Sequence, residues 1–300
     1  MVEGVAWDAG TRSGRSAQSV EARRRAEVFH GLHHGSDALV LVNAWDAGSA
    51  RVIEQAGAAA VATTSAGMAW SLGYADGEQV PSGEFIAASA RICRAVTVPV
   101  SVDIERGFGR STDEVCAIVG ALIGLGVVGV NIEDGIAVGT GQVESPSALC
   151  ERIEALRALA ERMNARLFIN ARSDTYLVTA TDRVARYEDT VRRANLYASA
   201  GADGIFAPGM DLQDVVPFAK AVSLPLNVYA GGGWAPPIHG LSRAGARRVS
   251  LGCGPLQSGF ALLRRIAREA LKQGTYNVMS ERMLGVGEVN ALFPSSLASR

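Results

Sequence analysis

From Asp37 onward the sequence repeats one pattern eight times: a short apolar segment, a turn and an amphipathic helical segment. Continuous apolar segments rich in β-branched residues are typical of parallel strands that are buried on both faces. The expected strands are 38–42, 59–63, 98–102, 127–132, 167–171, 204–207, 224–228 and 248–251. The expected helices are 47–56, 81–96, 112–125, 146–164, 183–200, 212–221, 237–244 and 255–272. Eight such units predict an α/β fold, a closed (β/α)8 barrel of the TIM type, with a doubly wound open sheet as the alternative.

The segments outside this repeat predict one domain with two extensions. Residues 1–25 are polar and rich in arginine, so we expect a flexible N-terminal arm. A short helix is expected at 26–34, with His30, His33 and His34 on a solvated face. The barrel domain is then predicted at 26–272, followed by a C-terminal tail at 273–300.

Composition excludes several classes of protein. The 29 basic and 30 acidic residues nearly cancel, so we expect neither a nucleic-acid-binding surface nor a polybasic membrane surface. No apolar run is long enough for a transmembrane helix, and the N-terminus has no hydrophobic signal-peptide core. The 4 cysteines are scattered without a Cys-x-x-Cys pair, which is typical of reduced thiols. These features predict a cytoplasmic protein whose partner is a small molecule.

Polar residues and glycine follow nearly every expected strand on its carboxyl side. In a parallel barrel these strand ends share one face, where active sites lie. The segments are 43–46, 63–67, 103–105, 131–134, 170–174, 208–209, residue 227 and 252–254. This consistent placement predicts an enzyme with its site on that face.

Three acidic residues at these ends are candidate ligands of a hard cation. Asp103 and Glu105 are separated by one residue, so in an extended segment they point to the same side. Glu133 follows the neighbouring strand. Such carboxylates favour either a shared proton or Mg²⁺, or Mn²⁺ in its place, while two solvated acids remain the alternative.

A cation and a turn of small residues complete the candidate site. The planar guanidinium of Arg172 suits a carboxylate or a phosphonate, although an ion pair with Glu133 or Asp174 is also open. The small residues at 64–67 allow their backbone N–H groups to approach an oxyanion. Together with a metal, these groups predict a site for an enolate beside a carboxylate.

Six stretches carry a resemblance to a known family. They are 43–50 (NAWDAGSA), 64–67 (TSAG), 72–76 (LGYAD), 102–109 (VDIERGFG), 129–134 (GVNIED) and 169–174 (INARSD). In this order they resemble the isocitrate lyase/phosphoenolpyruvate mutase superfamily over about residues 37–272. The resemblance implies a Mg²⁺-dependent barrel that acts on small α-oxo or α-hydroxy carboxylates through an enolate. It also implies a homo-oligomer, a dimer or a tetramer, with a C-terminal helix swapped between subunits.

The resemblance further implies a role for each matching residue. Asp103 would bind Mg²⁺ directly, while Glu105 and Glu133 would act through water. Catalysis would fall to Asp76, Glu133 and Arg172. Substrate binding would fall to Trp45, Thr64, Ser65, Ala66, Asp103, Arg172 and Asn227.

One departure from the family concerns the loop after the fourth strand. The lyase branches carry a Lys-Lys-Cys-Gly-His type motif there, whereas residues 135–146 (GIAVGTGQVESP) contain no Cys, Lys or His. Cys150 lies just beyond and is expected to pack in a helix. We therefore expect a lyase that needs no cysteine, or a decarboxylase.

Three alternatives stay open. The first is P–C bond chemistry of the mutase or hydrolase type, and the second is a non-catalytic relative that binds a metabolite. The third is a different barrel enzyme that binds phosphate at the glycines of 231–233 and 252–254. Tight turns are the alternative for both sets, and we prefer that interpretation for Gly252 and Gly254 because Pro255 suits a helix start.

Overall fold

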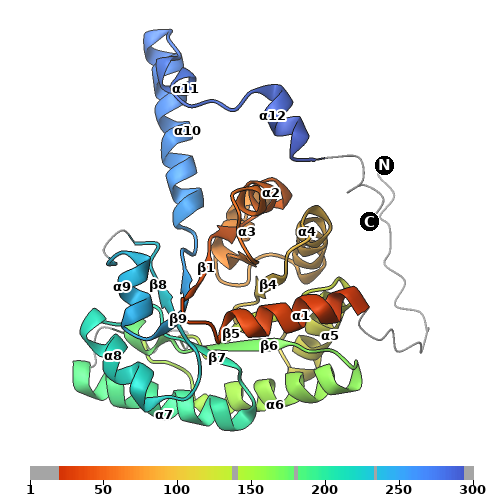
Figure 1. Cartoon of the computed structure of the whole chain (residues 1–300), viewed down its shortest axis with the longest axis vertical. Coiled ribbons are helices and arrows are strands. Elements are labelled where there is room, and N and C mark those ends of the chain that lie inside the picture. Colours follow the sequence, from red (N-terminus) through yellow and green to blue (C-terminus); the bar gives the residue numbers. More distant parts are fainter. Residues whose placement is uncertain (1–19, 137–140, 179–181, 233–234, 294–300) are drawn as a thin grey trace.

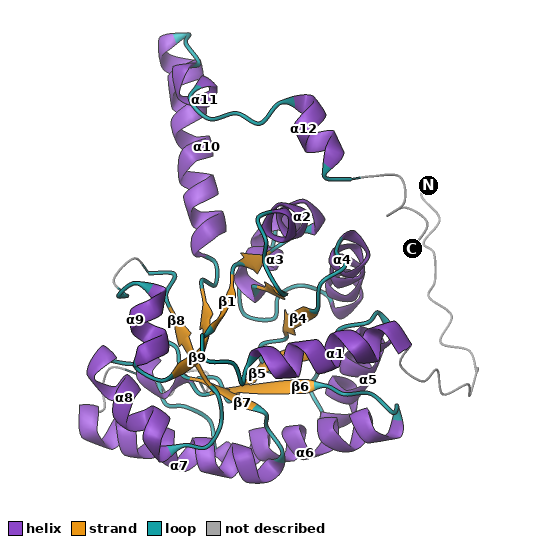
Figure 2. Ribbon diagram, in the orientation of Figure 1, coloured by secondary structure: helices purple, strands orange, loops and turns teal. Residues whose placement is uncertain are grey.

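The computed structural model describes residues 20–136, 141–178, 182–232 and 235–293. Within these ranges nine strands pair in parallel around a barrel that is ringed by helices (Figures 1 and 2). The predicted (β/α)8 barrel is confirmed, and the open sheet is wrong. The strands are β1 Leu39–Leu41, β2 Asn43–Ala44, β3 Val61–Thr63, β4 Val100–Asp103, β5 Gly129–Glu133, β6 Phe168–Arg172, β7 Gly204–Phe206, β8 Leu226–Tyr229 and β9 Ala246–Ser250.

Helices follow the strands as the repeat predicts, with an additional helix between β3 and α4. Those around the barrel are α2 Ala47–Gln55, α3 Ser65–Leu72, α4 Ser82–Ala95, α5 Thr112–Gly124, α6 Pro146–Arg162, α7 Arg183–Ala200, α8 Leu212–Ala221 and α9 Ile238–Arg243. A short 3₁₀ helix, η1 Asp174–Leu177, follows β6. Outside the ring lie α1 Val20–Leu32, α10 Gly254–Gln273, α11 Asn277–Ser280 and α12 Val286–Ala291.

The first expected strand is divided, and this division closes the barrel. β1 pairs with β9 and β2 pairs with β3, so the segment 39–44 contacts both ends of the strand order. The side chain of Asn43 spans the join, because its Nδ2 donates to the Thr63 carbonyl at 2.8 Å and its Oδ1 accepts from the Gly252 N–H at 2.8 Å. Asn43 was expected to follow the strand and is instead part of it.

Helix α1 packs against the amino-terminal end of the barrel. Phe29 meets Phe168 edge-on with ring centroids 5.5 Å apart, and the His33 ring stacks on Phe168 at 4.0 Å. His33 is 1% exposed, so the expected solvated face is wrong at this position. The helix also includes 20–25, which were expected in the N-terminal arm.

The C-terminal helices leave the barrel. In Figure 1, α10 extends away from the strands and α11 lies at its far end. The tail returns to the body where Arg51 Nε of α2 donates to the Leu292 carbonyl at 2.6 Å. Residues 1–19, most of the expected arm, and 294–300, the end of the expected tail, lie outside the described residues. Across the described ranges, no helix combines the length and the apolar character that crossing a membrane requires.

Candidate active site at the carboxyl ends of the strands

Asp103, the last residue of β4, lies at the centre of the expected site. Its Oδ2 accepts hydrogen bonds from the Ser65 hydroxyl at 2.9 Å and the Ser65 N–H at 3.2 Å. Its own N–H donates to the Thr63 hydroxyl at 3.0 Å. The other carboxylate oxygen, Oδ1, is buried and has no hydrogen-bond partner among the described residues. The carboxylate is therefore held rigidly on one side and open on the other.

Glu105 reaches the same region by a different geometry from the one expected. The strand ends at Asp103, and Glu105 has φ +48°, so the two residues do not belong to one extended segment. The argument that their spacing places them on one face is therefore wrong. Burial, and next the charge of Asp103, raise the pKa of Glu105 to about 8, and its carboxylate accepts a hydrogen bond from the Glu78 backbone. The two carboxylates are close despite the turn.

Glu133 and Arg172 form a buried ion pair on neighbouring strands. Arg172 Nη1 lies 2.8 Å from Glu133 Oε2, and Arg172 Nε lies 2.6 Å from Asp174 Oδ1. The register pairs the two strand-end residues directly. Burial alone would lower the pKa of Arg172, but the charges of Glu133, Asp174 and Asp103 together raise it. The ion pair that the sequence left open for Arg172 is therefore present, with both Glu133 and Asp174 as partners.

Asp76 and Asn227 bring two further groups to the site. Burial and then the charge of Asp103 raise the pKa of Asp76, which retains exposed surface. Asn227 of β8 is 1% exposed, and its Oδ1 accepts from the Ser250 hydroxyl at 3.2 Å. Its Nδ2 has no partner among the described residues. This amide offers a free donor for a carboxylate.

The small residues after β3 begin a helix. Thr64 is the N-cap of α3, and its hydroxyl accepts from the Gly67 N–H at 3.4 Å. Ser65 and Ala66 are the first residues of the helix, where N–H groups without intrahelical partners and the helix dipole favour negative charge, and the Ser65 N–H already donates to the Asp103 carboxylate. A Cβ on Gly67 would lie 3.1 Å from Trp45 Cβ, so the glycine lets Trp45 pack against the helix. The expected oxyanion-binding turn is thus a helix N-terminus.

The residues present fit a magnesium ion that is held by one direct ligand. Within the described residues, no three His, Cys, Asp or Glu side chains gather closely enough to hold a metal by themselves. Mg²⁺ needs less, because it keeps several waters and binds proteins through one or two carboxylates. The unpartnered Asp103 Oδ1 supplies one such oxygen. Burial and mutual repulsion raise the pKa values of Glu105 and Glu133, and a cation nearby would favour their ionised forms.

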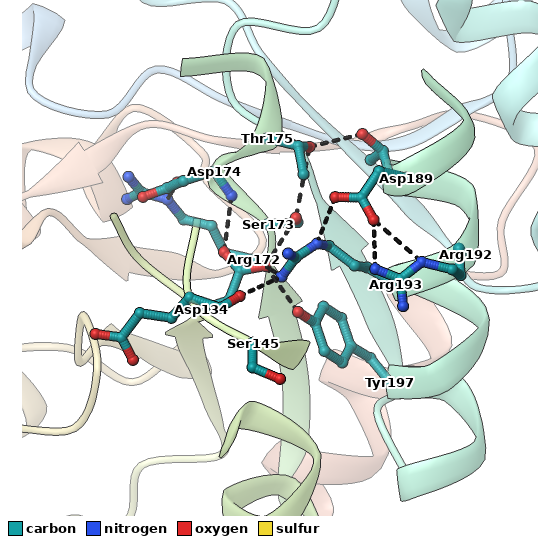
Figure 3. Close-up of polar contacts among 12 residues, drawn as sticks. Asp134, Ser145, Arg172, Ser173, Asp174, Thr175, Asp189, Arg192, Arg193 and Tyr197 are labelled. Atoms are coloured by element: carbon teal, nitrogen blue, oxygen red, sulfur yellow. Dashed lines mark hydrogen bonds and ion pairs between the residues drawn. The ribbon is translucent and has the colours of Figure 1, made fainter. Parts of the chain in front are cut away.

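A buried network beside the site was not predicted from the sequence. Asp134 accepts hydrogen bonds from the Ser173 hydroxyl at 2.9 Å, the Tyr197 hydroxyl at 2.7 Å, Arg193 Nη1 at 3.0 Å and the Asp174 N–H at 2.9 Å (Figure 3). This network joins the end of β5 to the segment after β6 and to α7. It holds in place the Asp174 carboxylate that binds Arg172.

Arg248 of β9 was also missed. It is 1% exposed, and its Nη2 donates to Asn131 Oδ1 on β5 at 3.2 Å. Arg247 and Arg248 are adjacent, and the alternation of a strand places one of two neighbours inward. That alternation was the available signal, but the sequence did not say which arginine faces the interior.

The glycines that suggested phosphate binding are accounted for by packing. Gly252 has φ +53°, and a Cβ there would lie 2.7 Å from the Tyr229 ring. A Cβ on Gly254 would lie 2.8 Å from the Gly231 carbonyl oxygen. Pro255 follows in the first turn of α10, as expected for a helix start. Gly233 lies outside the described residues.

Comparisons with known proteins agree with this architecture. The family model described as phosphoenolpyruvate phosphomutase matches residues 29–271. An uncharacterized protein of Mycobacterium tuberculosis (strain H37Rv) is 34% identical over 241 residues, which cover 80% of this chain and 87% of that protein. An oxaloacetate decarboxylase of Bradyrhizobium sp. (strain BTAi1) is 30% identical over 232 residues, 76% of this chain and 77% of the decarboxylase. A solved structure from Burkholderia cenocepacia J2315, provisionally assigned as a lyase or mutase, has a TM-score of 0.82 and 33% identity, covering 92% of this chain and 97% of that one.

Proposed function

This chain belongs to the isocitrate lyase/phosphoenolpyruvate mutase superfamily, and we propose that it is a magnesium-dependent decarboxylase of a small α-oxo dicarboxylate such as oxaloacetate. It is an enzyme of the lyase type that this superfamily contains. One observation carries the narrower proposal. The chain keeps Asp103, Glu133 and Arg172 in the barrel mouth, while the loop 135–146 has no Cys, Lys or His to act as an acid or base.

Decarboxylation fits such a loop because it needs no protein acid at the bond that breaks. The C–C bond electrons pass into the enolate as CO₂ leaves, and the proton that completes the product can come from water. Lyases that release a larger carbonyl fragment need a group to manage a further proton. Identity does not separate the two reactions, because the relative named oxaloacetate decarboxylase is 30% identical over 232 residues and a probable 2-methylisocitrate lyase of Corynebacterium glutamicum is 31% identical over 185 residues. The composition of the loop therefore carries the proposal.

The residues of this chain have distinct tasks in the proposal. Arg172 binds one carboxylate of the substrate, with its guanidinium oriented by Glu133 and Asp174. Asn227 Nδ2 donates to a carboxylate oxygen. The N-terminus of α3 at Ser65 and Ala66 favours the negative charge that develops on the oxo oxygen. A magnesium ion held by Asp103, and through water by Glu105 and Glu133, would add positive charge beside that oxygen.

Calorimetric titration with oxalate, which mimics the enolate of pyruvate, tests the site first. We expect binding that requires Mg²⁺, and a loss of that binding in Arg172→Lys, which keeps the charge but loses the planar fork. Arg162→Lys, at the exposed end of α6, is the matched control and should bind as the wild type does. Absence of oxalate binding with and without Mg²⁺ would contradict an enolate site.

Release of CO₂ and pyruvate from oxaloacetate then tests the reaction. The rate must exceed that of the same Mg²⁺ solution without protein, because the metal alone promotes this decarboxylation. Phosphonopyruvate in a parallel assay tests the P–C alternative, which the matched family model and the suitability of Arg172 for a phosphonate support. Oxalate binding without turnover of either compound would favour the metabolite-binding alternative and contradict the decarboxylase proposal.

A further inference from the structure

Arg248 places a guanidinium on the axis of the barrel. In the strand order, β9 and β5 are four strands apart in both directions, so they face each other across the interior. Arg248 Nη2 on β9 nevertheless bonds Asn131 Oδ1 on β5 at 3.2 Å. The side chain must therefore cross the barrel. Arg248 pairs with Asn227 of β8 and lies two residues before the carboxyl end of β9 at Ser250, so it belongs to a layer below the mouth of the barrel.

Three hydrogen-bond donors meet no acceptor in this layer. Arg248 Nε and Nη1 are buried without a partner among the described residues, and so is Asn227 Nδ2. Asn227 is paired with Arg248 in the strand register, so the two side chains are neighbours. In the orientation that the structure gives, the Asn227 oxygen accepts from the Ser250 hydroxyl at 3.2 Å, and the amide nitrogen is the group left without a partner among the described residues. A cluster that contains only hydrogen-bond donors favours a ligand whose atoms are hydrogen-bond acceptors.

The charge of Arg248 is also left without a close counterion. In the described part of the chain, no carboxylate oxygen lies within 4 Å of its nitrogens. Asn131 Oδ1, its one bonded acceptor there, is neutral and is shared with Asn170 Nδ2 at 2.8 Å. His33, on the opposite side from the mouth, donates Nδ1–H to the Phe29 carbonyl and stays neutral, with a pKa of about 3 caused first by burial. A buried unpaired cation is costly, and water would satisfy its donors without neutralising it.

We propose that the interior of the barrel, beneath the carboxylate mouth, binds one small monovalent anion through Arg248 Nε, Arg248 Nη1 and Asn227 Nδ2. The ligand is a halide or a carboxylate group. It comes either from solution, as chloride does, or from the inner end of the bound substrate. The site differs from the metal site, whose groups are acceptors, because all of its groups are donors.

Thermal unfolding of the full chain tests this inference. Chloride replaces gluconate at constant ionic strength and constant magnesium gluconate; gluconate is the reference because its long polyol chain should keep its carboxylate out of the buried site. We expect a saturable rise in Tm, roughly 2–4 °C at the upper end of the titration, with bromide acting alike. Arg248→Met should lose the saturable rise, whereas Arg247→Met, which removes the same charge from the adjacent residue, should keep it. A Tm that follows ionic strength alone would overturn the proposal.

A crystal of the wild-type protein grown with bromide gives a test that needs no variant. We expect an anomalous peak within bonding distance of Arg248 and Asn227, which decides the matter even if Arg248→Met does not fold. Water alone at these donors, with no bromide, would overturn the proposal. Neither measurement depends on catalysis, so failure of the decarboxylase proposal would be distinguishable from failure of this one.

Oxalate titrations in chloride and in gluconate separate the two sources of the anion. A roughly tenfold weaker apparent affinity at high chloride would show that the carboxylate of the ligand occupies the same donors. An unchanged affinity, together with the chloride effect on Tm, would show that the anion from solution has its own place. Both outcomes support the site and identify its occupant.

Discussion

At the scale of single residues, the mouth of the barrel contains several buried acidic side chains and few cationic ones. Asp103 is the common neighbour, because its charge contributes to the raised pKa values of Asp76, Glu105 and Glu133, after burial in each case. Ser65 fixes one of its oxygens and leaves the other unpartnered. Its contribution is therefore to the site more than to the core.

The first prediction concerns Asp103. Asp103→Ala should weaken Mg²⁺ binding at least about 100-fold, because loss of a residue that only orients a metal ligand costs about 10–100-fold and this residue is the proposed direct ligand. Circular dichroism should show an unchanged fold. Asp113→Ala, in the exposed first turn of α5, serves as the control and should bind Mg²⁺ normally. Unchanged metal affinity in Asp103→Ala would remove the residue from this role.

The second prediction concerns Cys150. It is half-buried on α6, and burial raises the pKa of its thiol, so the sulfur is protonated at neutral pH. Cys150→Ser should therefore keep oxaloacetate decarboxylation within about twofold of the wild-type rate. A loss of roughly 100-fold or more, the scale of a missing general acid or base, would restore a cysteine mechanism.

The third prediction concerns His33, whose pKa is lowered to about 3, first by burial and next by the charge of Arg248. Since the unfolded value is near 6.5, its neutral form contributes fully above pH 6.5, and that contribution is lost as pH falls toward 3. Between pH 6.5 and 5.5 the loss is about 1 kcal/mol. Urea unfolding should show this part of the pH dependence disappear in His33→Phe, which keeps a ring against Phe168, and persist in His34→Gln, at an exposed position.

The positions of some of these residues could be predicted from the sequence, and those of others could not. Asp103, Glu133 and Arg172 were predictable because each ends an apolar strand, and the fold alone brings strand ends together. Arg248 was not, since choosing between two adjacent arginines requires the register of β9 against its neighbours. The position of Glu105 depends on a single positive φ angle, which no side-chain pattern announces.

At the scale of elements, α7 secures the site from outside the barrel. Arg193 of α7 donates to Asp134 at 3.0 Å and to the Glu144 carbonyl at 2.7 Å, and it also pairs with Asp189 on its own helix at 2.8 Å. One guanidinium thus joins the helix to both ends of the segment that follows β5.

The fourth prediction measures this network by urea unfolding. Asp134→Ala should cost about 3–5 kcal/mol, because it removes the fully buried counterion of Arg193 and leaves only the more exposed Asp189 carboxylate. Tyr197→Phe, which removes one of the donors to Asp134, should cost about 1 kcal/mol. Tyr187→Phe on the same helix is the control, since that ring packs edge-on against Phe218 away from the network. Equal costs for the two tyrosine variants would contradict the role of Tyr197.

Elements were predictable where the apolar pattern is continuous. The eight barrel units stand close to their predicted ranges, whereas α3 was missed because Ser-Ala-Gly is typical of a turn. Gly67 is nevertheless required inside that helix by its contact with Trp45. The start of α1 was missed because arginines dominate its composition, although Ala22, Ala26 and Phe29 form a buried stripe at helical spacing.

At the scale of the whole molecule, the C-terminal helices present apolar side chains to solvent. Phe260, Leu263 and Leu271 of α10 are exposed, and so are Met283 and Val286 beyond it. A helix that leaves its own barrel in this way needs another surface to cover it. A partner subunit, as the family resemblance implies, is the cover we expect.

The fifth prediction tests that assembly by light scattering coupled to size exclusion. Met283→Asp combined with Val286→Asp should shift the protein to a smaller oligomer, because charges replace side chains that are 68% and 79% exposed in the single chain. Arg282→Ser, beside them, should leave the mass unchanged. A wild-type protein that is already monomeric would contradict the expectation.

The divided first strand has a consequence for how the chain folds during synthesis. Leu39 pairs with Arg248, so the last seam of the barrel joins residues more than two hundred positions apart. Until β9 has left the ribosome, β1 has no neighbour on that side, and the growing sheet keeps an open edge at which another chain can pair. Contacts between residues so far apart in the sequence slow folding. The same short segment that closes the barrel therefore keeps one unpaired edge until nearly the whole barrel has been synthesised.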